Sequence, residues 1–593
     1  MNATYTKPFR VQEQRLIDAE GREVRLWGVN YYLPFSHNYI NVRDRGADHL
    51  AAIDRDIRDF RLLGVQLVRM HVFDREISDM YGNLVENDHL RVFDYLINQL
   101  QANGIYLMIT TMAWWNTVEN QSLLDKRYAF WEAGQSPAFG FANFCPKHAL
   151  IWHPQALDCE ERYLRGLFTH QNCFSGLRLP EYDNLVVIEV INEPEYPSPK
   201  IINRLAAEKH QLALNPIGRE EIKLLDLYAA YRQEGQADHS EETANEFCAG
   251  LVDRYLTRMF GIVDEYFDGS VLKTHIYYNY KVPAFRRVLQ QTTAIDCISL
   301  AFYGGNWDGT PSYAPRMLEG DVRKVYTDYQ ENGIRELGKG LLTYEWAMNC
   351  TGTGFDMGAY AQAMTALGVQ MASYFTYTPA DVAEYNAGWL MQYLNIRHTP
   401  RRAAAFAAAG EMFRHLPLGS ALPTDPVRWE TDHSIVDSSV DLTAYHDDLT
   451  YISAGDAAAV TVADSSAAPQ RIFGSGHSPY VQHEGNGCYL LERVSADELR
   501  LLVLPDQFYV NDPLHGKYFG FANRFIDINK EPVVSRLKEL GSSMQIRYPG
   551  FDRVRIAKCV EGQLIEVALE ATGVFRADPG EYVLRRAGRK QND

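Results

Sequence analysis

Apolar residues form short continuous runs, separated by segments in which they recur every three or four positions. The first three runs, VRLWGVNYY, VQLVRMHVF and IYLMITTM, cover residues 24–32, 65–73 and 105–112. Runs of this kind are typical of strands buried on both faces. Segments with helical spacing lie between the runs, and Asp48 and Asp88 open the two expected helices. The order strand, helix, strand predicts parallel pairing.

The same alternation continues through the first two thirds of the chain. Before the first run, residues 9–17 and 23–27 flank a turn at 18–22 and predict a β-hairpin. After the third run, expected strands lie at 185–191, 271–279, 294–305, 338–347 and 368–379, and expected helices at 282–293, 321–332, 358–367 and 401–415. Eight strands followed by helices predict an α/β fold, a (β/α)8 TIM barrel over residues 1–415.

Two connections of this expected barrel are unusually long, 113–183 after the third strand and 195–270 after the fourth. Long loops at the carboxyl ends of barrel strands usually shape a binding pocket.

The pattern changes after residue 415. Residues 416–426 are rich in Pro, Gly and Ser, which predicts a linker. Beyond them, short β-rich runs such as 489–494, 499–505 and 543–548 predict a sandwich-like β accessory domain at 427–593. Three roles stay open for this domain: bracing the barrel, forming a homo-oligomer, or binding glycans.

Composition and charge narrow the function. The 593 residues are 46% hydrophobic and 23% charged, which is ordinary for a soluble globular protein. The net charge of −18 argues against a nucleic acid or an anionic membrane as partner. The start, MNATYTKPFRVQEQ, lacks the apolar core of a secretory signal. We therefore expect a cytoplasmic protein, or a secreted or periplasmic one if a leader has been removed. The 8 Cys contain no CxxC pair, so neither a disulfide framework nor a zinc site is expected.

The fourth expected strand ends in Asn192-Glu193-Pro194. Because proline stops sheet pairing, Glu193 should sit at the carboxyl end of the strand, where a barrel keeps its active site. A carboxylate in this place could also cap a helix or form a salt bridge. Glu189 lies on the same strand face but deeper, and we expect it to be a buried carboxylate paired with a neighbour.

The seventh expected strand, LLTYEWAMN, puts Glu345 where the fourth puts Glu193. Two carboxyl groups facing one barrel mouth suit the cleavage of a glycosidic bond, since one must be protonated and the other ionised. A separation of about 5–5.5 Å leads to retention of configuration through a covalent intermediate. Mutual repulsion raises one of the two pKa values, so that both protonation states exist near neutral pH.

Asn192-Glu193-Pro194 and Glu345, each ending a strand of one eightfold pattern, resemble the clan A glycoside hydrolases, family 5 in particular. The resemblance covers residues 9–415 and implies that Glu193 is the acid/base and Glu345 the nucleophile, with no cofactor. It further implies that Arg69 hydrogen-bonds the nucleophile. Asn192 would bind the sugar 2-hydroxyl, and Tyr303 would donate to the nucleophile. A barrel arginine that merely pairs with a carboxylate, and a packed rim tyrosine, stay open as structural interpretations.

Further candidates for substrate binding are His275 on the fifth strand and three aromatic residues at expected strand ends, Trp114, Trp346 and Tyr377. Aromatic faces stack on sugar rings by burying their C–H surface. For each single residue, packing in the core is equally open.

The chain departs from the family at three strand ends. Ala301 stands where a His usually precedes the sixth-strand Tyr, and Thr110-Thr111-Met112-Ala113 lacks the His that often ends the third strand. The eighth strand reads Phe375-Thr376-Tyr377-Thr378, without the usual Trp. These departures indicate a divergent branch or a neighbouring family of the clan.

The function that the sequence favours is a retaining β-glycosidase acting on β-linked oligosaccharides or glycosides, leaning towards exo action. An endo-acting β-mannanase or β-glucanase is the alternative, and a non-catalytic carbohydrate-binding barrel is another. A metal-dependent hydrolase would need a His-x-His at the end of the first strand, which instead reads Val29-Asn30-Tyr31-Tyr32.

Overall fold

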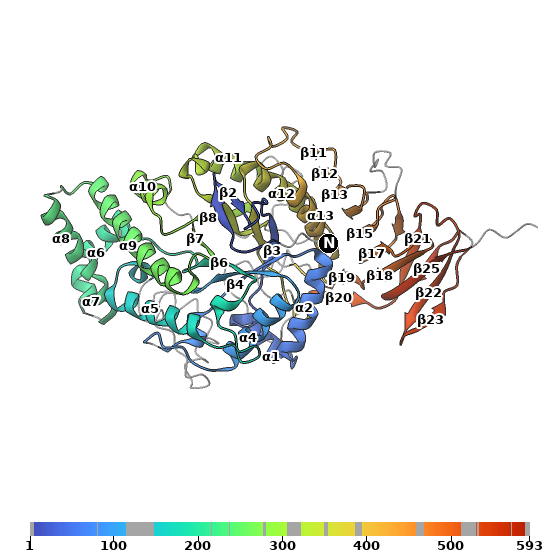
Figure 1. The fold of residues 1–593 in the computed structure, drawn as a ribbon, viewed down its shortest axis with the longest axis horizontal. Helices are drawn as coiled ribbons and strands as arrows, with labels where there is room; N and C mark the ends of the chain where they lie inside the picture. The colour runs from blue at the N-terminus through green and yellow to red at the C-terminus, as the bar shows by residue number, and fades with distance from the viewer. Residues whose placement is uncertain are drawn as a thin grey trace, which may run out of the picture.

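The larger part of the molecule is a closed barrel of eight parallel strands surrounded by helices (Figure 1). The computed structural model describes residues 5–79, 81–113, 147–214, 216–236, 238–276, 280–304, 322–348, 354–385, 394–457, 468–510, 529–530, 533–570 and 572–587. In order around the barrel the strands are β3 (Leu26–Asn30), β4 (Leu67–His71), β5 (Tyr106–Thr110), β6 (Leu185–Glu189), β7 (Leu272–Ile276), β8 (Cys297–Gly304), β9 (Gly340–Met348) and β10 (Met371–Tyr374). The predicted TIM barrel is confirmed.

Helices cover the outer face of the strands, as the repeated pattern predicts. In chain order after each strand come α2 (His49–Leu63), α4 (Asp88–Ala102), α5 (Pro154–Thr169), α9 (Glu241–Phe267), α10 (Pro283–Gln291), α11 (Arg323–Glu331), α12 (Phe355–Leu367) and α13 (Pro400–His415). Asp48 caps α2 by accepting from the backbone N–H of Ala51 at 2.8 Å. In α4 the cap is Asn87, one residue before the Asp88 that opens the helix.

The amino-terminal segment closes the bottom of the barrel. The tight hairpin is formed by β1 (Arg10–Gln12) and β2 (Arg15–Ile17), so it lies inside the first predicted arm. The second predicted arm contributes only a bridge from Glu23 to Ile17. Phe9 and Leu16 pack with interior residues of the barrel strands such as Leu67. This apolar plug leaves the carboxyl ends of the strands as the place for polar chemistry.

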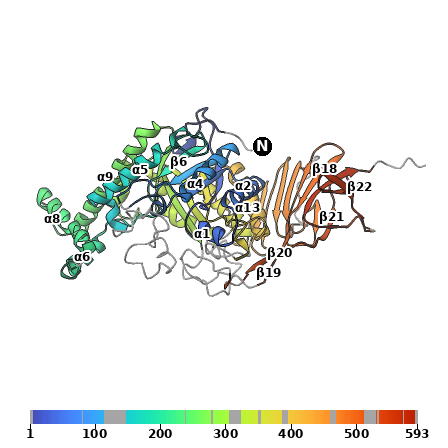
Figure 2. The same cartoon turned by 90° about the horizontal axis from the view of Figure 1, so that it is seen from below.

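The described parts of the long connections contain several helices. The connection after β5 contains α5. The connection after β6 forms α6 (Pro199–Leu212), α7 (Pro216–Glu221), α8 (Lys223–Gly235) and α9. Figure 1 shows α6, α7 and α8 as an arm that extends away from the barrel, and the view in Figure 2 agrees. Short helices α1 (Ser36–Asp44) and α3 (Asp74–Ile77) follow β3 and β4.

The carboxyl-terminal part is β-rich, as predicted. A ten-stranded sheet has the order β11-β12-β13-β14-β15-β17-β18-β25-β22-β23, and a three-stranded sheet has the order β16-β21-β24. Residues such as Tyr489 and Phe575 form a separate core in this part. The strands of the large sheet are β11 (Arg428–Glu430), β12 (Ser434–Asp437), β13 (Leu442–His446), β14 (Thr450–Ala454), β15 (Arg471–Ser475), β17 (Cys488–Arg493), β18 (Glu498–Val503), β25 (Gly580–Arg586), β22 (Val554–Val560) and β23 (Gln563–Glu566); those of the small one are β16 (Val481–His483), β21 (Ser542–Ile546) and β24 (Phe575–Ala577). A further pair is β19 (Asp506–Tyr509) with β20 (Ser535–Lys538).

The first half of the large sheet packs directly on α12 and α13, and its Trp429, Val436 and Tyr445 belong to the same core as the barrel helices. A Cβ on Gly358 of α12 would lie 2.6 Å from Cγ2 of Val436 and 2.8 Å from Oγ1 of Thr443. Only a glycine allows the sheet to approach this closely. All of α12 is buried as a result.

Residues 416–426, the predicted linker, form no helix or strand and lie against the barrel. Arg25 donates to the carbonyl of Leu416 at 2.5 Å, and the backbone N–H of Gly419 donates to the carbonyl of Thr365 at 2.9 Å. In the part of the chain that the structure describes, no helix has the length and apolar character needed to cross a membrane.

Candidate active site

Arg69 lies at the centre of a polar network inside the carboxyl end of the barrel. It belongs to β4 and is fully buried. Nη2 donates to Oε2 of Glu189 at 2.6 Å and to Oδ1 of Asn192 at 2.9 Å, while Nη1 donates to Oε1 of Glu345 at 3.0 Å. One guanidinium therefore connects β4 with β9 and with the end of β6, and its charge is shared by two carboxylates.

Glu345 is held by groups from two further positions. The hydroxyl of Tyr303, on β8, donates to Oε2 of Glu345 at 2.8 Å. Nε2 of His71, at the end of β4, lies 3.4 Å from Oε1. The Glu345 side chain is 7% exposed, so these contacts replace most of the water that a free carboxylate would bind.

A bulge in β9 turns two consecutive residues toward this network. In the pairing with β8, Tyr344 is the extra residue between Thr343 and Glu345. The Tyr344 hydroxyl donates to Oε1 of Glu193 at 2.9 Å, and the centre of its ring lies 4.8 Å from the guanidinium carbon of Arg69. Both carboxyl groups are therefore contacted from one short piece of β9.

Glu193 sits just beyond β6 in a strained backbone conformation. Its φ is 42°, in the left-handed region that non-glycine residues enter at a cost of about 1–2 kcal/mol. The backbone N–H of the preceding Asn192 donates to the carbonyl of Met112 at 2.8 Å, which continues the strand pairing up to this point. Residues held in such conformations concentrate at functional sites.

The surroundings move the pKa values of Glu193 and Glu345 in opposite directions. Burial raises the pKa of Glu193, and the negative charge of Glu345 raises it further; the opposing charge of Lys147 does not cancel these effects. Burial also acts to raise the pKa of Glu345, but its contact with His71 and the charge of Arg69 outweigh that effect, so its pKa lies below the usual value. The arrangement favours one protonated and one ionised carboxyl group.

Tyr303 and His71, which lie beside Glu345, are both uncharged at physiological pH. Burial, followed by the charge of Glu345, raises the pKa of Tyr303 well above its usual value, so the phenol retains its proton and can donate it to a hydrogen bond. Burial, together with the charge of Arg69, lowers the pKa of His71 to about 4. His71 is therefore neutral at physiological pH.

Two predicted sugar contacts are wrong. Trp346 is fully buried and faces the helix layer, 4.7 Å from the ring of Trp27 and 4.8 Å from that of Tyr374. The pleat of β9 points it away from the site because its neighbour Glu345 points in. Tyr377 is also fully buried: its ring packs against Phe60, and its hydroxyl donates to Oδ2 of Asp59 at 3.2 Å.

His275 does not join the network either. Thr274 bonds across the barrel interior to Ser299 at 2.8 Å, so the next residue along β7 faces outward. Nε2 of His275 lies 2.5 Å from the hydroxyl of the buried Tyr196, and burial lowers the pKa of His275 to about 3. It is a hydrogen-bonded core histidine, the alternative that the sequence left open.

The remaining positions singled out in the sequence have different surroundings. Trp114 lies outside the described residues. Glu189 is fully buried and paired with Arg69, as expected, and also accepts from Thr110 at 2.6 Å. Thr110 thus occupies the strand end where the family often has a His. Phe375, in place of the usual Trp, has its ring 6.4 Å from that of His71.

Sequence reasoning missed His71 and Tyr344. His71 could have been found, because it follows Arg69 by two positions and a strand places such residues on one face. Tyr344 could not, because its inward direction depends on a bulge that no apolar pattern reveals.

Comparison with known proteins gives similarity of fold. No family model and no curated protein matches the chain. Solved structures with a similar fold include the endo-1,4-beta-mannanase from Rhizomucor miehei (12% identity, covering 68% of this chain and 99% of that chain, TM-score 0.44). A second is an exo-beta-1,4-mannosidase from Opitutaceae bacterium strain TAV5 (14% identity, covering 68% of this chain and 62% of that chain, TM-score 0.42). A third is a glycoside hydrolase family 5 mannosidase from Rhizomucor miehei (10% identity, covering 70% of this chain and 99% of that chain, TM-score 0.41).

Similarities of this size do not transfer a function. The chemistry of this site has to follow from its own residues.

Proposed function

We propose that this chain is a retaining β-glycosidase that hydrolyses β-linked oligosaccharides or glycosides by double displacement. Glu345 attacks the anomeric carbon as nucleophile, while Glu193 protonates the departing oxygen. Glu193 then takes a proton from the water that releases the sugar from Glu345. Arg69 and Tyr303 orient Glu345 and keep it ionised, and Asn192 binds the 2-hydroxyl of the sugar.

The single observation that carries the proposal is that two carboxyl groups of one network have different partners: Glu345 accepts from Arg69 at 3.0 Å and from Tyr303 at 2.8 Å, whereas Glu193 accepts from Tyr344 at 2.9 Å. The pKa of Glu193 is raised by burial and by Glu345, and that of Glu345 is lowered by His71 and Arg69. A binding site for a neutral sugar has no need of two carboxyl groups in different protonation states. An acid and a nucleophile that act together need this division.

We further propose that the enzyme is exo-acting. The connections that follow β5 and β6 run over residues 111–184 and 190–271, and both leave the strands at the carboxyl end of the barrel. Insertions of this length beside the two carboxyl groups favour a short substrate over a polysaccharide lying across an open groove.

The test is turnover of a panel of 4-nitrophenyl β-glycosides, with gluco, manno, galacto and xylo configurations, by the full chain. We expect release of nitrophenol from at least one of them, with the β-anomer of the free sugar as the first product seen by NMR. An α-anomer as first product would contradict double displacement.

Two alternative functions give other results. An endo-acting β-mannanase or β-glucanase would lower the viscosity of a polysaccharide strongly for each bond cleaved, whereas an exo-acting enzyme would release monosaccharide. A non-catalytic carbohydrate-binding barrel would bind oligosaccharides with no turnover of any substrate in the panel.

A further inference from the structure

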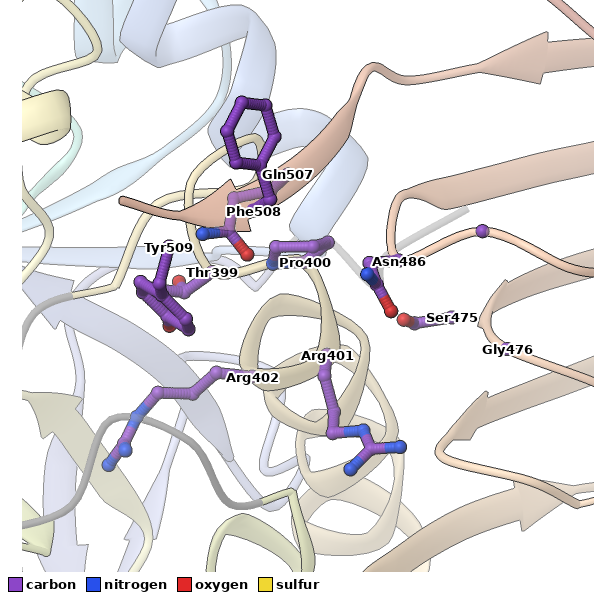
Figure 3. Close-up of a pocket in the computed structure, with 11 residues that line it drawn as sticks. Thr399, Pro400, Arg401, Arg402, Ser475, Gly476, Asn486, Gln507, Phe508 and Tyr509 are labelled. Carbon is purple, nitrogen blue, oxygen red and sulfur yellow. The ribbon is translucent and has the colours of Figure 1, made fainter. Parts of the chain in front are cut away.

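A cavity lies where the barrel meets the carboxyl-terminal sheets. Its volume is about 360 Å³, and its wall is formed by the start of α13, by the ends of strands of the large sheet and by β19 (Figure 3). None of the residues that line it belongs to the candidate active site. The volume falls within the range of small-molecule sites, about 300–1,000 Å³.

The start of α13 gives one wall of the cavity a positive potential. The helix begins with Pro400, has no acidic residue in its first turn and carries Arg401 and Arg402 there. Thr399 does not cap the helix with its side chain; its hydroxyl exchanges hydrogen bonds with the backbone of Asn395 at 2.9 Å. Cations at a helix N-terminus add to the positive end of the macrodipole, and an anion placed there is stabilised.

Both arginines have carboxylate partners, but these stand outside the cavity lining. Arg401 donates to Asp441 at 2.8 Å and Arg402 to Asp356 at 3.2 Å. Among the described residues that line the cavity there is no Asp or Glu, although Asp506 lies directly behind the lining residue Gly485. The lining therefore offers donors without a fixed negative charge of its own.

Gln507 on β19 is an independent sign of a missing acceptor. Its side chain is buried, with 6% of the residue exposed, and Nε2 has no hydrogen-bond partner among the residues that the structure describes. Figure 3 shows its amide turned toward Thr399 and Pro400 at the start of the helix. A buried donor without an acceptor destabilises the folded protein, and an oxygen of a bound ligand would supply the missing acceptor.

The remaining lining suits a ligand with an organic body. Ser475 and Asn486 reach the cavity from the sheet on one side of Pro400, and Tyr509 lies on the other side (Figure 3). Tyr509 is 40% exposed, so that its ring offers an apolar surface at the edge of the cavity.

We propose that this cavity binds a small organic oxyanion, a phosphate ester or a carboxylate of about monosaccharide size. The anionic head accepts from the first turn of α13, from the Arg401 side chain and from Nε2 of Gln507, while Tyr509 covers part of the body. The proposal stands independently of the glycosidase function, since it uses none of the barrel-mouth residues.

Calorimetric titration of the full chain at constant ionic strength tests it, with glucose 6-phosphate, glucuronate, inorganic phosphate and glucose as probes. We expect saturable binding of glucose 6-phosphate or glucuronate, and the comparison of these two decides between a phosphate and a carboxylate head. Glucose should not bind at this site. Equal binding of glucose and glucose 6-phosphate would overturn the anion assignment, as would the absence of saturable binding of all anions.

Three variants locate the binding. Arg401→Ala and Gln507→Leu should each weaken it about tenfold. Arg91→Ala is the matched control, since Arg91 and Arg401 are both 47% exposed and each lies 2.8 Å from one carboxylate. Gln507→Leu should leave the melting temperature of the ligand-free protein unchanged or raise it, because the amide nitrogen has no partner to lose. Anion binding that survives both cavity variants would place the site elsewhere and refute the proposal.

Discussion

The hydroxyl of Tyr344 lies 2.9 Å from Oε1 of Glu193, although Tyr344 is the chain neighbour of Glu345. The bulge in β9 makes this possible, because it turns both residues toward the same network. The positions of the two carboxyl groups are therefore linked through one peptide unit. A shift of β9 would move the nucleophile and the hydrogen-bond donor of the acid together.

Tyr344→Phe should impair the acid more than the nucleophile. Its hydrogen bond lowers the pKa of Glu193, so its loss raises that pKa further. Because the acid works while protonated, the basic limb of the pH profile of kcat/KM should move to higher pH. We expect about a tenfold fall in kcat/KM for phenyl glycosides, which need protonation to depart, and a smaller fall for 2,4-dinitrophenyl glycosides.

The control for this prediction is Tyr280→Phe. Tyr280 also donates to a carboxylate, Oδ2 of Asp328 at 2.8 Å, but outside the network around Arg69. Tyr280→Phe should leave both limbs of the pH profile of kcat/KM unchanged. An equal fall for both leaving groups in Tyr344→Phe would show that the tyrosine does not act through Glu193.

Replacing each carboxyl group and adding azide separates their roles. Glu345→Gly should reduce turnover by more than about 10⁴-fold, and azide should restore it by forming the glycosyl azide of inverted configuration. Glu193→Ala should keep turnover of dinitrophenyl glycosides and give the azide of retained configuration. NMR of the azide products reads the outcome. The reverse pattern would exchange the two assignments.

Arg69→Met should move the acid limb of the pH profile. Arg69 lowers the pKa of Glu345, and the nucleophile works while ionised, so activity is lost as the pH falls through that pKa. Without the guanidinium the pKa rises, and the loss should begin at higher pH. The variant should also be less stable by about 3–5 kcal/mol, because Glu189 remains buried without its partner.

Arg25→Met provides the comparison, since Arg25 is also buried but bonds to the backbone of Leu416. Denaturant unfolding and the pH profile of kcat/KM are measured for both variants. Loss of stability is expected in each, but only Arg69→Met should move the acid limb. An unmoved limb in Arg69→Met would mean that Arg69 does not control the charge of Glu345.

Two glycine-to-alanine substitutions should change the free energy of unfolding in opposite directions. In an open helix position alanine is more favourable than glycine by about 1 kcal/mol. Gly261 of α9 has nothing within 4 Å of an added Cβ, so Gly261→Ala should stabilise the protein. Gly358→Ala should instead destabilise it by about 1–3 kcal/mol, because the added carbon would overlap Val436 and Thr443. Denaturant midpoints measure both, and stabilisation by Gly358→Ala would contradict the close packing of α12 on the sheet.

The eightfold pattern could be predicted because barrel strands such as β4 and β6 are buried on both faces, which leaves a continuous apolar run in the sequence. Glu193 and Glu345 could be placed at the barrel mouth because strand ends carry their own signals. The directions of the Trp346 and His275 side chains could not be predicted because side chains alternate along a strand. Trp346 lies one position from Glu345 on a bulged strand, and the sequence does not show which of two neighbours turns inward.

The packing between barrel and sheet could not be predicted for a different reason. The sequence predicts a β-rich domain at 427–593 and does not show what its apolar residues pack against; some form a separate core, but Trp429 and Val436 are buried against α12 and α13. An apolar residue in the sequence indicates that its side chain is buried, but it does not indicate which element packs against that side chain. The cavity at the start of α13 arises from the same packing.

Because all of α12 is buried under the first strands of the large sheet, the barrel depends on the carboxyl-terminal domain for the burial of its own helices. A chain that ended inside residues 416–426 would lack the sheet that covers α12 and α13. The apolar surfaces of these two helices would then be exposed to water. The shortened barrel should aggregate during expression. A replacement of the carboxyl-terminal domain by an unrelated domain should fail unless the new domain has an apolar surface complementary to α12 and α13.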